Sequence, residues 1–371
     1  MNLKTPTILL IILTIVSCSL ESSYPKADWT IMFYLADDYI TLPLTADIDE
    51  LTSKEVVTKS IRLVILYDGP LNGDGTLTVL DSPFITNSRN IELSSTAINI
   101  NSENELDMAK EETLESYIKY VKDKLPADNY GLYFGSHGTG YKSWVESGLA
   151  VENGEDQLLT PKEISSAIKN TGEMSIVVFD ACNMGNIETL YEFKETKVEY
   201  IIASPELIPG PGNDYINFIN AVYQAPNLTP QSLGETTLEV YYNYYKENPT
   251  INNNHNAESL QNLYNVGEIK KIVESNEFKN ELTTLLSKKD NNTTMFDFEE
   301  YDIFTETPTK PNYSNILDIL DNQYMFNNAI TKPQNGDYLW LSIYTPTIYN
   351  PGYEDTKFAN ETGWNDIVKN Q

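Results

Sequence analysis

Short, almost entirely apolar segments that alternate with helical segments constrain the fold of this chain more than any other feature. The segments of strand length are Trp29 to Leu35, Ile61 to Tyr67, Tyr130 to Phe134, Ser175 to Phe179 and Tyr200 to Ala203. Strands that are apolar throughout are buried on both faces, which is typical of a parallel sheet covered by helices on each side. The pattern therefore predicts an α/β sandwich whose chemistry lies in loops at the carboxyl ends of the strands.

Helical segments separate these strands. Apolar side chains recur at helical spacing in Leu44 to Lys59, Asp107 to Leu125, Thr160 to Lys169 and Ile187 to Phe193. The third segment begins with Thr160 and carries Glu163 three residues later, which is the pattern of a capping box. Thr76 to Leu80 alternates between apolar and polar residues, so we expect a hairpin or an edge strand there.

The sequence changes its character beyond Pro226. Gln231 to Tyr245 and Ala257 to Ser287 have helical patterns, and Leu339 to Tyr344 has the pattern of one late strand. We therefore predict two regions in the exported protein. An α/β region covers residues 28–225, and a mainly helical C-terminal region covers residues 226–371, with its late strand returning to the core.

The N-terminus has the features of an export signal. The apolar run from Thr7 to Val16 is too short to span a bilayer, and after a basic start it has the length of a signal-peptide core. It ends in Ile15-Val16-Ser17-Cys18, which resembles the lipobox of bacterial lipoproteins. We expect a signal peptide over residues 1–17 and a tether, lipidated at Cys18, over residues 18–27. A lipidated Cys18 would anchor the protein to a membrane at the cell envelope or cell surface. The alternative is an ordinary secretory signal with a chance cysteine.

Charge and cysteine content exclude several classes of partner and scaffold. The chain has 25 Lys and Arg residues against 54 Asp and Glu residues, a formal net charge of -29. Such a surface repels phosphate backbones, so we expect no nucleic-acid partner. The only cysteines are Cys18 and Cys182, and the only histidines are His137 and His255. These residues provide neither a disulfide framework nor the short paired spacing of a zinc site, and we predict no metal site of that kind.

Two strand ends carry candidate catalytic residues. One buried strand stops in a glycine-rich turn that holds His137, and the next core strand stops at Cys182. Neighbouring strands lie about 5 Å apart, so side chains from adjacent strand ends can meet. A lipidated Cys18 also leaves Cys182 as the one thiol of the mature protein. We therefore expect both side chains to project from the same edge of the sheet.

This pairing suits nucleophilic catalysis. The positive end of a helix that follows Cys182, together with an imidazolium partner, lowers the pKa of a thiol. His137 can protonate a leaving amine and then activate water. Backbone N–H groups of Gly138 and Cys182 can face a developing oxyanion, since Gly138 has no side chain to block the approach. The alternative is a buried structural cysteine beside a turn histidine that makes one backbone hydrogen bond.

The two strand ends also resemble motifs of a known family. Gly135-Ser136-His137-Gly138-Thr139-Gly140 and Phe179-Asp180-Ala181-Cys182-Asn183-Met184-Gly185 resemble the histidine and cysteine motifs of the clostripain family of cysteine peptidases. The order of the two motifs and the spacing between them also fit. Asp28 to Asp37 is similar to the opening strand of the family. Its specificity loop is similar to Ala203-Ser204-Pro205-Glu206, Pro209-Gly210-Pro211-Gly212 and Asp214-Tyr215. Leu341 to Tyr344 and Phe358 to Trp364 resemble its closing strand and final helix.

The resemblance implies a caspase-like αβα sandwich and a Cys182/His137 dyad in a catalytic region over residues 28–225. It also implies cleavage after Arg or Lys in protein or peptide substrates that expose these residues. A carboxylate in a partly dry pocket pairs with such a side chain. Glu206 and Asp214 lie in the matching loop, and Asp180 lies two residues before the cysteine. Of these three residues, Glu206 is our first candidate for the specificity residue. The alternative for Asp180 is that it caps a helix or bonds the loop backbone.

Two properties of some relatives find weak support in this sequence. Some members mature by cutting themselves after a basic residue in the loop that follows the histidine. Between His137 and Thr160 the one basic residue is Lys142, so a single-chain enzyme is expected. Some members need calcium, but Asn72-Gly73-Asp74-Gly75 does not complete an EF-hand pattern. We predict no cofactor, with calcium as the open alternative.

Two other functions compete with a peptidase. The first is a catalytically inactive surface lipoprotein that keeps the peptidase fold as a binding module. The second is a serine hydrolase that uses Ser136. The second fits poorly, because Phe134 stands where the G-x-S-x-G turn needs glycine.

Overall fold

The computed structural model describes thirteen stretches of the chain. They are residues 24–36, 44–53, 60–71, 74–80, 89–90, 106–138, 149–152, 157–205, 207–251, 261–280, 330–331, 341–343 and 351–369. The predicted signal peptide and Cys18 lie outside these stretches, as do residues 139–148, which include Lys142. None of the helices within the described stretches combines the length and the apolar character that crossing a bilayer requires.

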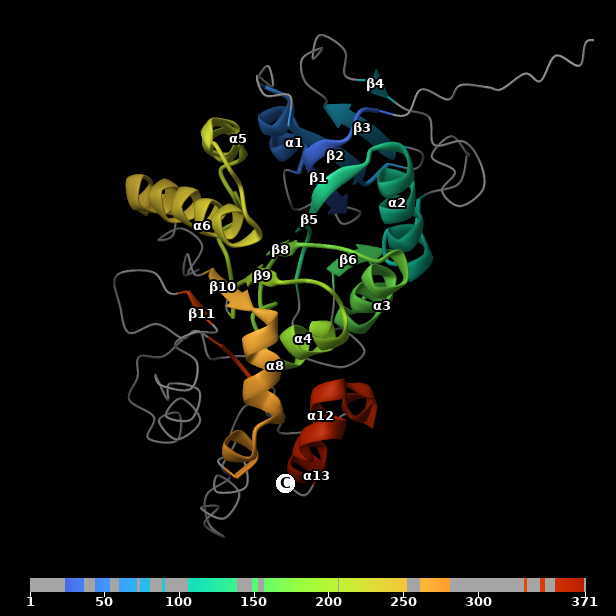
Figure 1. Cartoon of the computed structure of the whole chain (residues 1–371), viewed down its shortest axis with the longest axis vertical. Helices are drawn as coiled ribbons and strands as arrows, with labels where there is room; N and C mark the ends of the chain where they lie inside the picture. The colour runs from blue at the N-terminus through green and yellow to red at the C-terminus, as the bar shows by residue number, and fades with distance from the viewer. Residues whose placement is uncertain are drawn as a thin grey trace, which may run out of the picture.

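One mixed sheet organises the molecule (Figure 1), with strand order β11-β10-β9-β8-β5-β1-β2-β3-β4. Its five central strands are parallel and are β1 (Ala27–Ala36), β2 (Ile61–Asp68), β5 (Ala127–Gly135), β8 (Ile176–Asp180) and β9 (Tyr200–Ala203). Antiparallel strands flank them, β3 (Thr76–Leu80) and β4 (Arg89–Asn90) on one side and β10 (Asn262–Asn265) and β11 (Ile330–Thr331) on the other. The predicted α/β fold with a mostly parallel sheet is confirmed.

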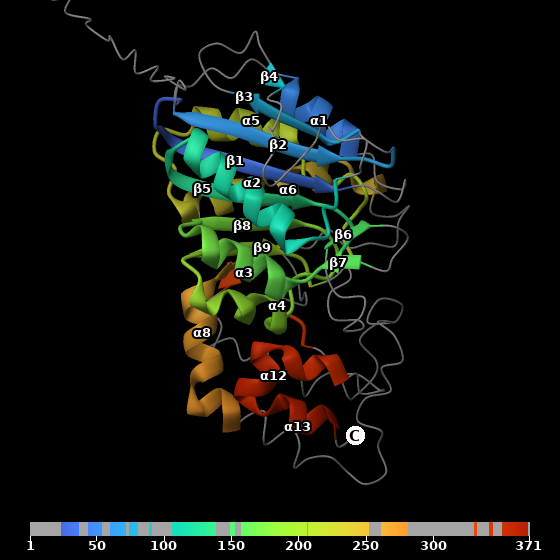
Figure 2. The ribbon, with the colours of Figure 1, turned by 90° about the vertical axis from the view of Figure 1, so that its right-hand side faces the viewer.

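Helices cover both faces of the sheet (Figure 2). One face carries α2 (Glu111–Lys124), α3 (Pro161–Thr171), α4 (Ile187–Glu192) and α8 (Val266–Glu274). The other face carries α1 (Leu44–Thr52), α5 (Tyr215–Gln224) and α6 (Pro230–Glu247). Strand β1 shows why both faces are needed: Met32 and Tyr34 pack into the first layer, whereas Ile31 and Phe33 pack into the second. Successive side chains of a strand point to opposite faces, so a strand that is apolar throughout must be covered by helices on both faces of the sheet.

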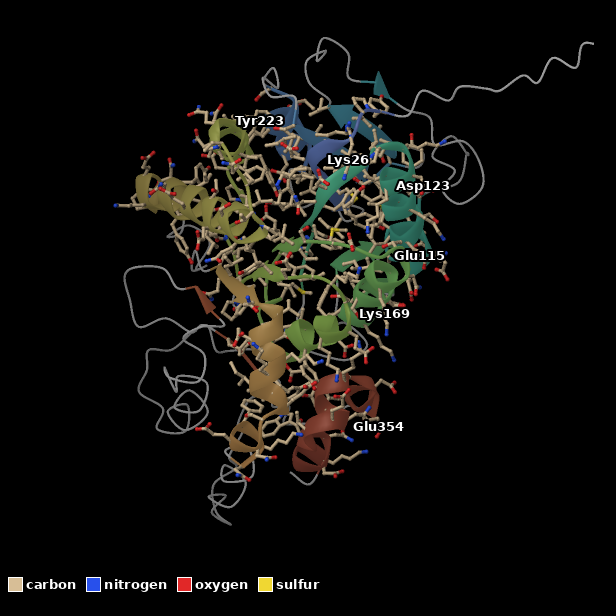
Figure 3. The ribbon with its side chains drawn as sticks, viewed as in Figure 1. Lys26, Glu115, Asp123, Lys169, Tyr223 and Glu354 are labelled. Carbon is tan, nitrogen blue, oxygen red and sulfur yellow. The ribbon has the colours of Figure 1, made fainter. Side chains whose placement is uncertain are left out.

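Local signals in the sequence account for several helix boundaries. The side chain of Thr160 accepts the N–H of Glu163, whose carboxylate accepts the N–H of Thr160, so the predicted capping box is present at α3. Helix α2 ends at Lys124, just before Leu125 and Pro126. Charged side chains lie on the outer sides of these helices, as Glu115, Asp123 and Lys169 do in Figure 3. The exposed ion pair of Lys169 with Glu195 is typical of this surface.

The C-terminal region differs from its predicted helical character at one point. The segment Ala257 to Ser287 was expected to be helical, but its described part contains β10 before α8 begins at Val266. Strand β10 pairs antiparallel with β9 and covers the sheet edge, a tertiary contact that no local pattern announces. Helix α5 and the hairpin of β6 (Leu149–Glu152) and β7 (Gln157–Leu159) were also not predicted.

The end of the chain packs back onto the core. A short turn η3 (Pro351–Asp355) leads into α12 (Lys357–Thr362) and α13 (Trp364–Lys369), which lie beside α4 and α8 (Figure 2). Of the predicted strand Leu339 to Tyr344, residues 341–343 are described, and Ser342 forms a parallel bridge with Asn186. The C-terminal elements therefore contact the segment that follows Cys182.

Candidate active site

The two strand ends singled out in the sequence lie side by side. Strands β5 and β8 are adjacent and parallel, and their last residues, Gly135 and Asp180, are register partners. The chain therefore leaves both strands at the same edge of the sheet. His137 and Cys182 both line one pocket at this edge. The structure thus brings the predicted nucleophile and its predicted partner to the same site.

Gly138 lies directly against the main chain of Cys182. A Cβ atom placed on Gly138 would lie 2.1 Å from the carbonyl oxygen of Cys182 and 2.9 Å from its nitrogen. Main-chain atoms cannot move aside as the end of a flexible side chain can, so this close approach requires glycine. The histidine turn and the cysteine peptide group are therefore packed together, as the predicted oxyanion pair of Gly138 and Cys182 requires.

The pKa of the Cys182 thiol is raised, whereas the sequence predicted that it would be lowered. Burial raises its pKa, the N–H of Ile208 lowers it by donating to the sulfur at 3.4 Å, and the charge of Asp180 raises it further. We expected the positive end of a helix to lower this pKa, but α4 begins at Ile187, five residues after the cysteine. The helix N-terminus therefore does not adjoin the sulfur, and burial dominates.

His137 is half-buried in the same pocket. Burial lowers the pKa of its imidazole, which disfavours the charged form. Burial therefore favours the uncharged form of both the imidazole and the thiol. A neutral imidazole can accept a proton, which is the state that a general base needs before reaction.

Asp180 forms the buried end of the pocket. Its side chain is 7% exposed, and Oδ2 accepts the N–H of Asn213 and the hydroxyl of Tyr215, each at 2.9 Å. Oδ1 has no hydrogen-bond partner among the described residues. Burial raises the pKa of this carboxyl, although the backbone N–H and the side chain of Asn213 and the hydroxyl of Tyr215 oppose the shift. Asp180 thus bonds the loop backbone and does not cap α4, whose N-cap is Asn186.

A loop rich in proline and glycine forms the pocket wall beside Asp180. Its Gly212 has φ of 62°, and a Cβ there would lie 2.6 Å from Asp180 Oδ2. The hydroxyl of Tyr245 donates to the carbonyl of Gly212 at 2.7 Å and holds the loop against α6. Tyr215 and the run Pro209-Gly210-Pro211-Gly212 belong to the predicted specificity loop, whereas no role was predicted for Ile208 or Tyr245.

The two other predicted specificity residues have different positions. Glu206 lies outside the described residues, so its prediction stays open. Asp214 is the N-cap of α5, where Oδ1 accepts the N–H of Asn217 at 3.0 Å, and it is not among the residues that line this pocket. Asp47 of α1 does line the pocket and adds a second carboxylate to its wall.

No group of three or more His, Cys, Asp or Glu side chains suited to a metal ion occurs within the stretches that the structure describes. Asp74, from the turn considered for calcium, accepts the N–H groups of Gly69 and Leu71. Asn72 and Gly73 lie outside the described stretches, so the expectation on calcium stays a prediction.

Comparison with known sequences agrees with this geometry. Residues 33–344 match the sequence model of the clostripain family. Clostripain of Hathewaya histolytica is 28% identical to this chain over 213 residues, which are 50% of this chain and 40% of the relative. The match therefore spans less than half the length of that relative.

Solved structures share the fold at low sequence identity. A secreted C11 cysteine protease from Bacteroides thetaiotaomicron, bound to an irreversible peptide inhibitor, has a TM-score of 0.62 and 17% identity. An inactive zymogen C11 protease from Parabacteroides distasonis has a TM-score of 0.59 and 18% identity. Each likeness covers 91% of this chain and 99% of the other. The fold found here is that of these proteases.

Proposed function

Because this chain belongs to the clostripain family of cysteine peptidases, we propose that it hydrolyses peptide bonds after Arg or Lys, with Cys182 as nucleophile and His137 as acid–base partner. One observation carries the proposal. Cys182, His137 and the buried residue Asp180 line a single pocket. A nucleophile, a base and a cation-binding group are the parts that such a reaction needs.

Asp180 is the group that selects the substrate in this proposal. A basic side chain that enters the pocket places its cation against Oδ1, which no described residue satisfies. A charge-assisted hydrogen bond in a water-poor pocket is stronger than one at the surface. Asp180 and Cys182 are two residues apart, so a side chain held by the carboxylate leaves its own carbonyl group close to the sulfur.

Substrate binding also prepares the thiol. In the free protein the charge of Asp180 helps to raise the pKa of Cys182. A bound cation compensates that charge, so the pKa of the thiol falls as the correct side chain enters. The proton of Cys182 then passes to the neutral imidazole of His137. Attack is thereby favoured for substrates with a basic residue and disfavoured for others.

The chemical steps follow from these positions. The sulfur attacks the carbonyl carbon, and backbone N–H groups of Gly138 and Cys182 receive the oxyanion. The imidazolium of His137 protonates the leaving amine, the carbon–nitrogen bond breaks, and a thioester remains on Cys182. His137 then removes a proton from water, which attacks the thioester and releases the acid and the free thiol.

Hydrolysis of an arginyl reporter peptide, in parallel with a thiol-reactive probe that carries an arginyl side chain, tests the proposal. We expect cleavage after Arg and Lys and rapid labelling of Cys182. Cys182→Ala should reduce the rate by at least about 10⁴-fold, since loss of a nucleophile removes the covalent route. A parent protein that neither cleaves nor labels would favour the inactive binding module instead.

We further propose that the protein is exported and held at a membrane through a lipid on Cys18, where it meets exposed Arg and Lys residues of proteins or peptides. The lipobox-like run before Cys18 supports this. Mass spectrometry of the N-terminal peptide from cells should find a diacylglyceryl group on Cys18. An unmodified Cys18 in a cleaved, secreted protein would exclude the anchor. No cofactor is proposed, and activity after chelation of divalent cations tests the calcium alternative.

A further inference from the structure

The loop that carries Cys182 is held from two sides by distant segments. The N–H of Gly185 donates to the carbonyl of Ser204 at the end of β9, at 2.6 Å. On the other side Ser342 donates its N–H to the carbonyl of Gly185 at 3.1 Å, and its carbonyl accepts the N–H of Ile187 at 2.9 Å. Asn183, beside the cysteine, has φ of 60°, a conformation that residues with side chains adopt at a cost. The loop conformation therefore depends on these external contacts.

The helix that follows the loop is unusual in having no exposed residue. All six residues of α4 are buried, and its two carboxylates, Glu188 and Glu192, are 0% and 1% exposed. A carboxylate that is withdrawn from water is costly unless donors replace the water. The position of α4 is thus determined by where those donors lie.

C-terminal residues supply these donors. The hydroxyl of Tyr353 donates to Glu188 Oε1 at 2.6 Å in the buried interior. The N–H of Lys357 donates to Glu192 Oε1, and its ammonium donates to the carbonyl of Glu192, both at 2.8 Å. These pairs differ from the partly exposed pair of Glu354 with Lys369 on the outside of the same region, labelled by Glu354 in Figure 3.

Two hydrogen bonds, joined by short stretches of main chain, connect Tyr353 to the nucleophile. Glu188 lies in the first turn of α4, whose N-cap is Asn186. Asn186 accepts the N–H of Thr189 through Oδ1 at 2.8 Å and donates through Nδ2 to the carbonyl of Asn183 at 2.9 Å. Asn183 is the residue that follows Cys182. A shift of α4 therefore moves the peptide group of the nucleophile.

We propose that Tyr353 and Glu188 are positioning residues for the reaction: their hydrogen bond fixes α4, and α4 fixes the loop that presents the thiol of Cys182. The C-terminal segment is then part of the catalytic apparatus, although it lies about 170 residues beyond the cysteine. Catalytic groups must be held to a fraction of an ångström, and a displacement of about 1 Å costs on the order of 10²-fold in rate. The inference rests on the proposed function.

Tyr353→Phe in the full chain tests the proposal, because it removes one hydroxyl and keeps the buried ring. We expect kcat on an arginyl reporter to fall about 10- to 100-fold, while KM stays near the parent value because the pocket is untouched. Amide hydrogen exchange over residues 183–192 should accelerate. Glu188→Gln retains the acceptor for Tyr353 and should keep kcat near the parent value, whereas Glu188→Ala should reproduce the loss.

Tyr117→Phe is the matched control. Tyr117 lies on α2, which is far from α4 in the chain, and is as fully buried as Tyr353. Its hydroxyl bonds to the carbonyls of Phe33 and Val64. This variant should lose stability in urea but keep kcat and the exchange rate of residues 183–192. Equal kcat values in both tyrosine variants, or unchanged exchange in Tyr353→Phe, would overturn the positioning role. If the parent itself cleaves nothing, the proposed function fails, and the exchange comparison alone then decides the coupling.

Discussion

The two edges of the parallel sheet treat their buried polar groups differently. At the amino edge Arg62 is 1% exposed. Its two terminal nitrogens donate to Pro25 O, Thr30 Oγ1 and Pro126 O, and its Nε makes no hydrogen bond within the described stretches. Thr30 in turn donates to the carbonyl of Leu125. At the carboxyl edge Asp180 Oδ1 is buried and lacks a partner in the described part of the chain.

This difference separates stability from chemistry within one sheet. A buried polar group that is bonded internally supports the fold, whereas one without a partner costs stability. The amino edge ties the chain entering β1 to the strands beside it. In the proposed function, the cation of a substrate supplies the partner that Asp180 Oδ1 lacks at the carboxyl edge.

Of the substitutions that test this difference between the two edges, Asp180→Asn should have the largest effect. We expect kcat/KM on arginyl reporters to fall about 10²- to 10³-fold, because loss of a buried charge partner costs roughly 3–5 kcal/mol in the bound state. Stability in urea should hold or rise, since the free protein no longer carries a buried carboxylate with an unsatisfied oxygen. Unchanged kcat/KM with lower stability would place Asp180 among the structural residues instead.

Gly138→Ala probes the contact between the two turns of the carboxyl edge. The new Cβ would meet the carbonyl oxygen of Cys182, so one turn must move, and we expect kcat to fall about 10- to 100-fold. Gly135→Ala is the matched control, because its Cβ would meet the end of the Leu35 side chain at 2.7 Å, which can rotate away. Similar kcat values for both variants would show that the close approach does not set the active geometry.

Arg62→Met tests the amino edge. The substitution fills a similar volume but leaves three acceptors without their donor, so we expect the free energy of unfolding to fall by roughly 2–4 kcal/mol. At temperatures where the variant is folded, kcat/KM should match the parent value. Urea titration and steady-state kinetics on the same preparation measure both quantities. A large loss of kcat/KM in the folded variant would contradict the division between the edges.

The smallest expected effect concerns the pH dependence of thiol alkylation. Only the thiolate of Cys182 reacts with iodoacetamide, and burial raises its pKa, so the rate should rise with pH beyond the range of an ordinary thiol. The negative charge of Asp180 contributes to the raised pKa. Asp180→Asn should therefore move the midpoint of the alkylation profile to lower pH. A midpoint that stays in place, or moves to higher pH, would show that this charge does not act on the thiol.

Much of the fold was predictable because each central strand has a recognisable local sequence pattern. Runs such as Ile61 to Tyr67 are apolar on both faces, and only a sheet with two covers accommodates them. Strand β10 was missed because its four residues, Asn262–Asn265, become a strand by covering the edge of β9. Their own sequence does not distinguish a short strand from the start of a helix.

The candidate site was predictable in its residues and not in their surroundings. His137 and Cys182 follow adjacent apolar strands, so their arrival at one edge follows from parallel pairing. The direction of the thiol pKa did not follow, because it depends on burial and on where α4 begins. The contacts of Asp180 with Asn213 and Tyr215 arise from a loop more than thirty residues further along the chain.

The sequence by itself therefore determined the five central strands and the edge of the sheet at which His137 and Cys182 lie, since these depend on periodicity and on strand direction. The tertiary structure alone decided how those residues are held and charged. Tyr353 reaches Glu188 across 165 positions, and the loop after Asp180 folds over its carboxylate. Burial and hydrogen-bond partners set both position and pKa, and both are properties of packed neighbours that come from separate parts of the chain.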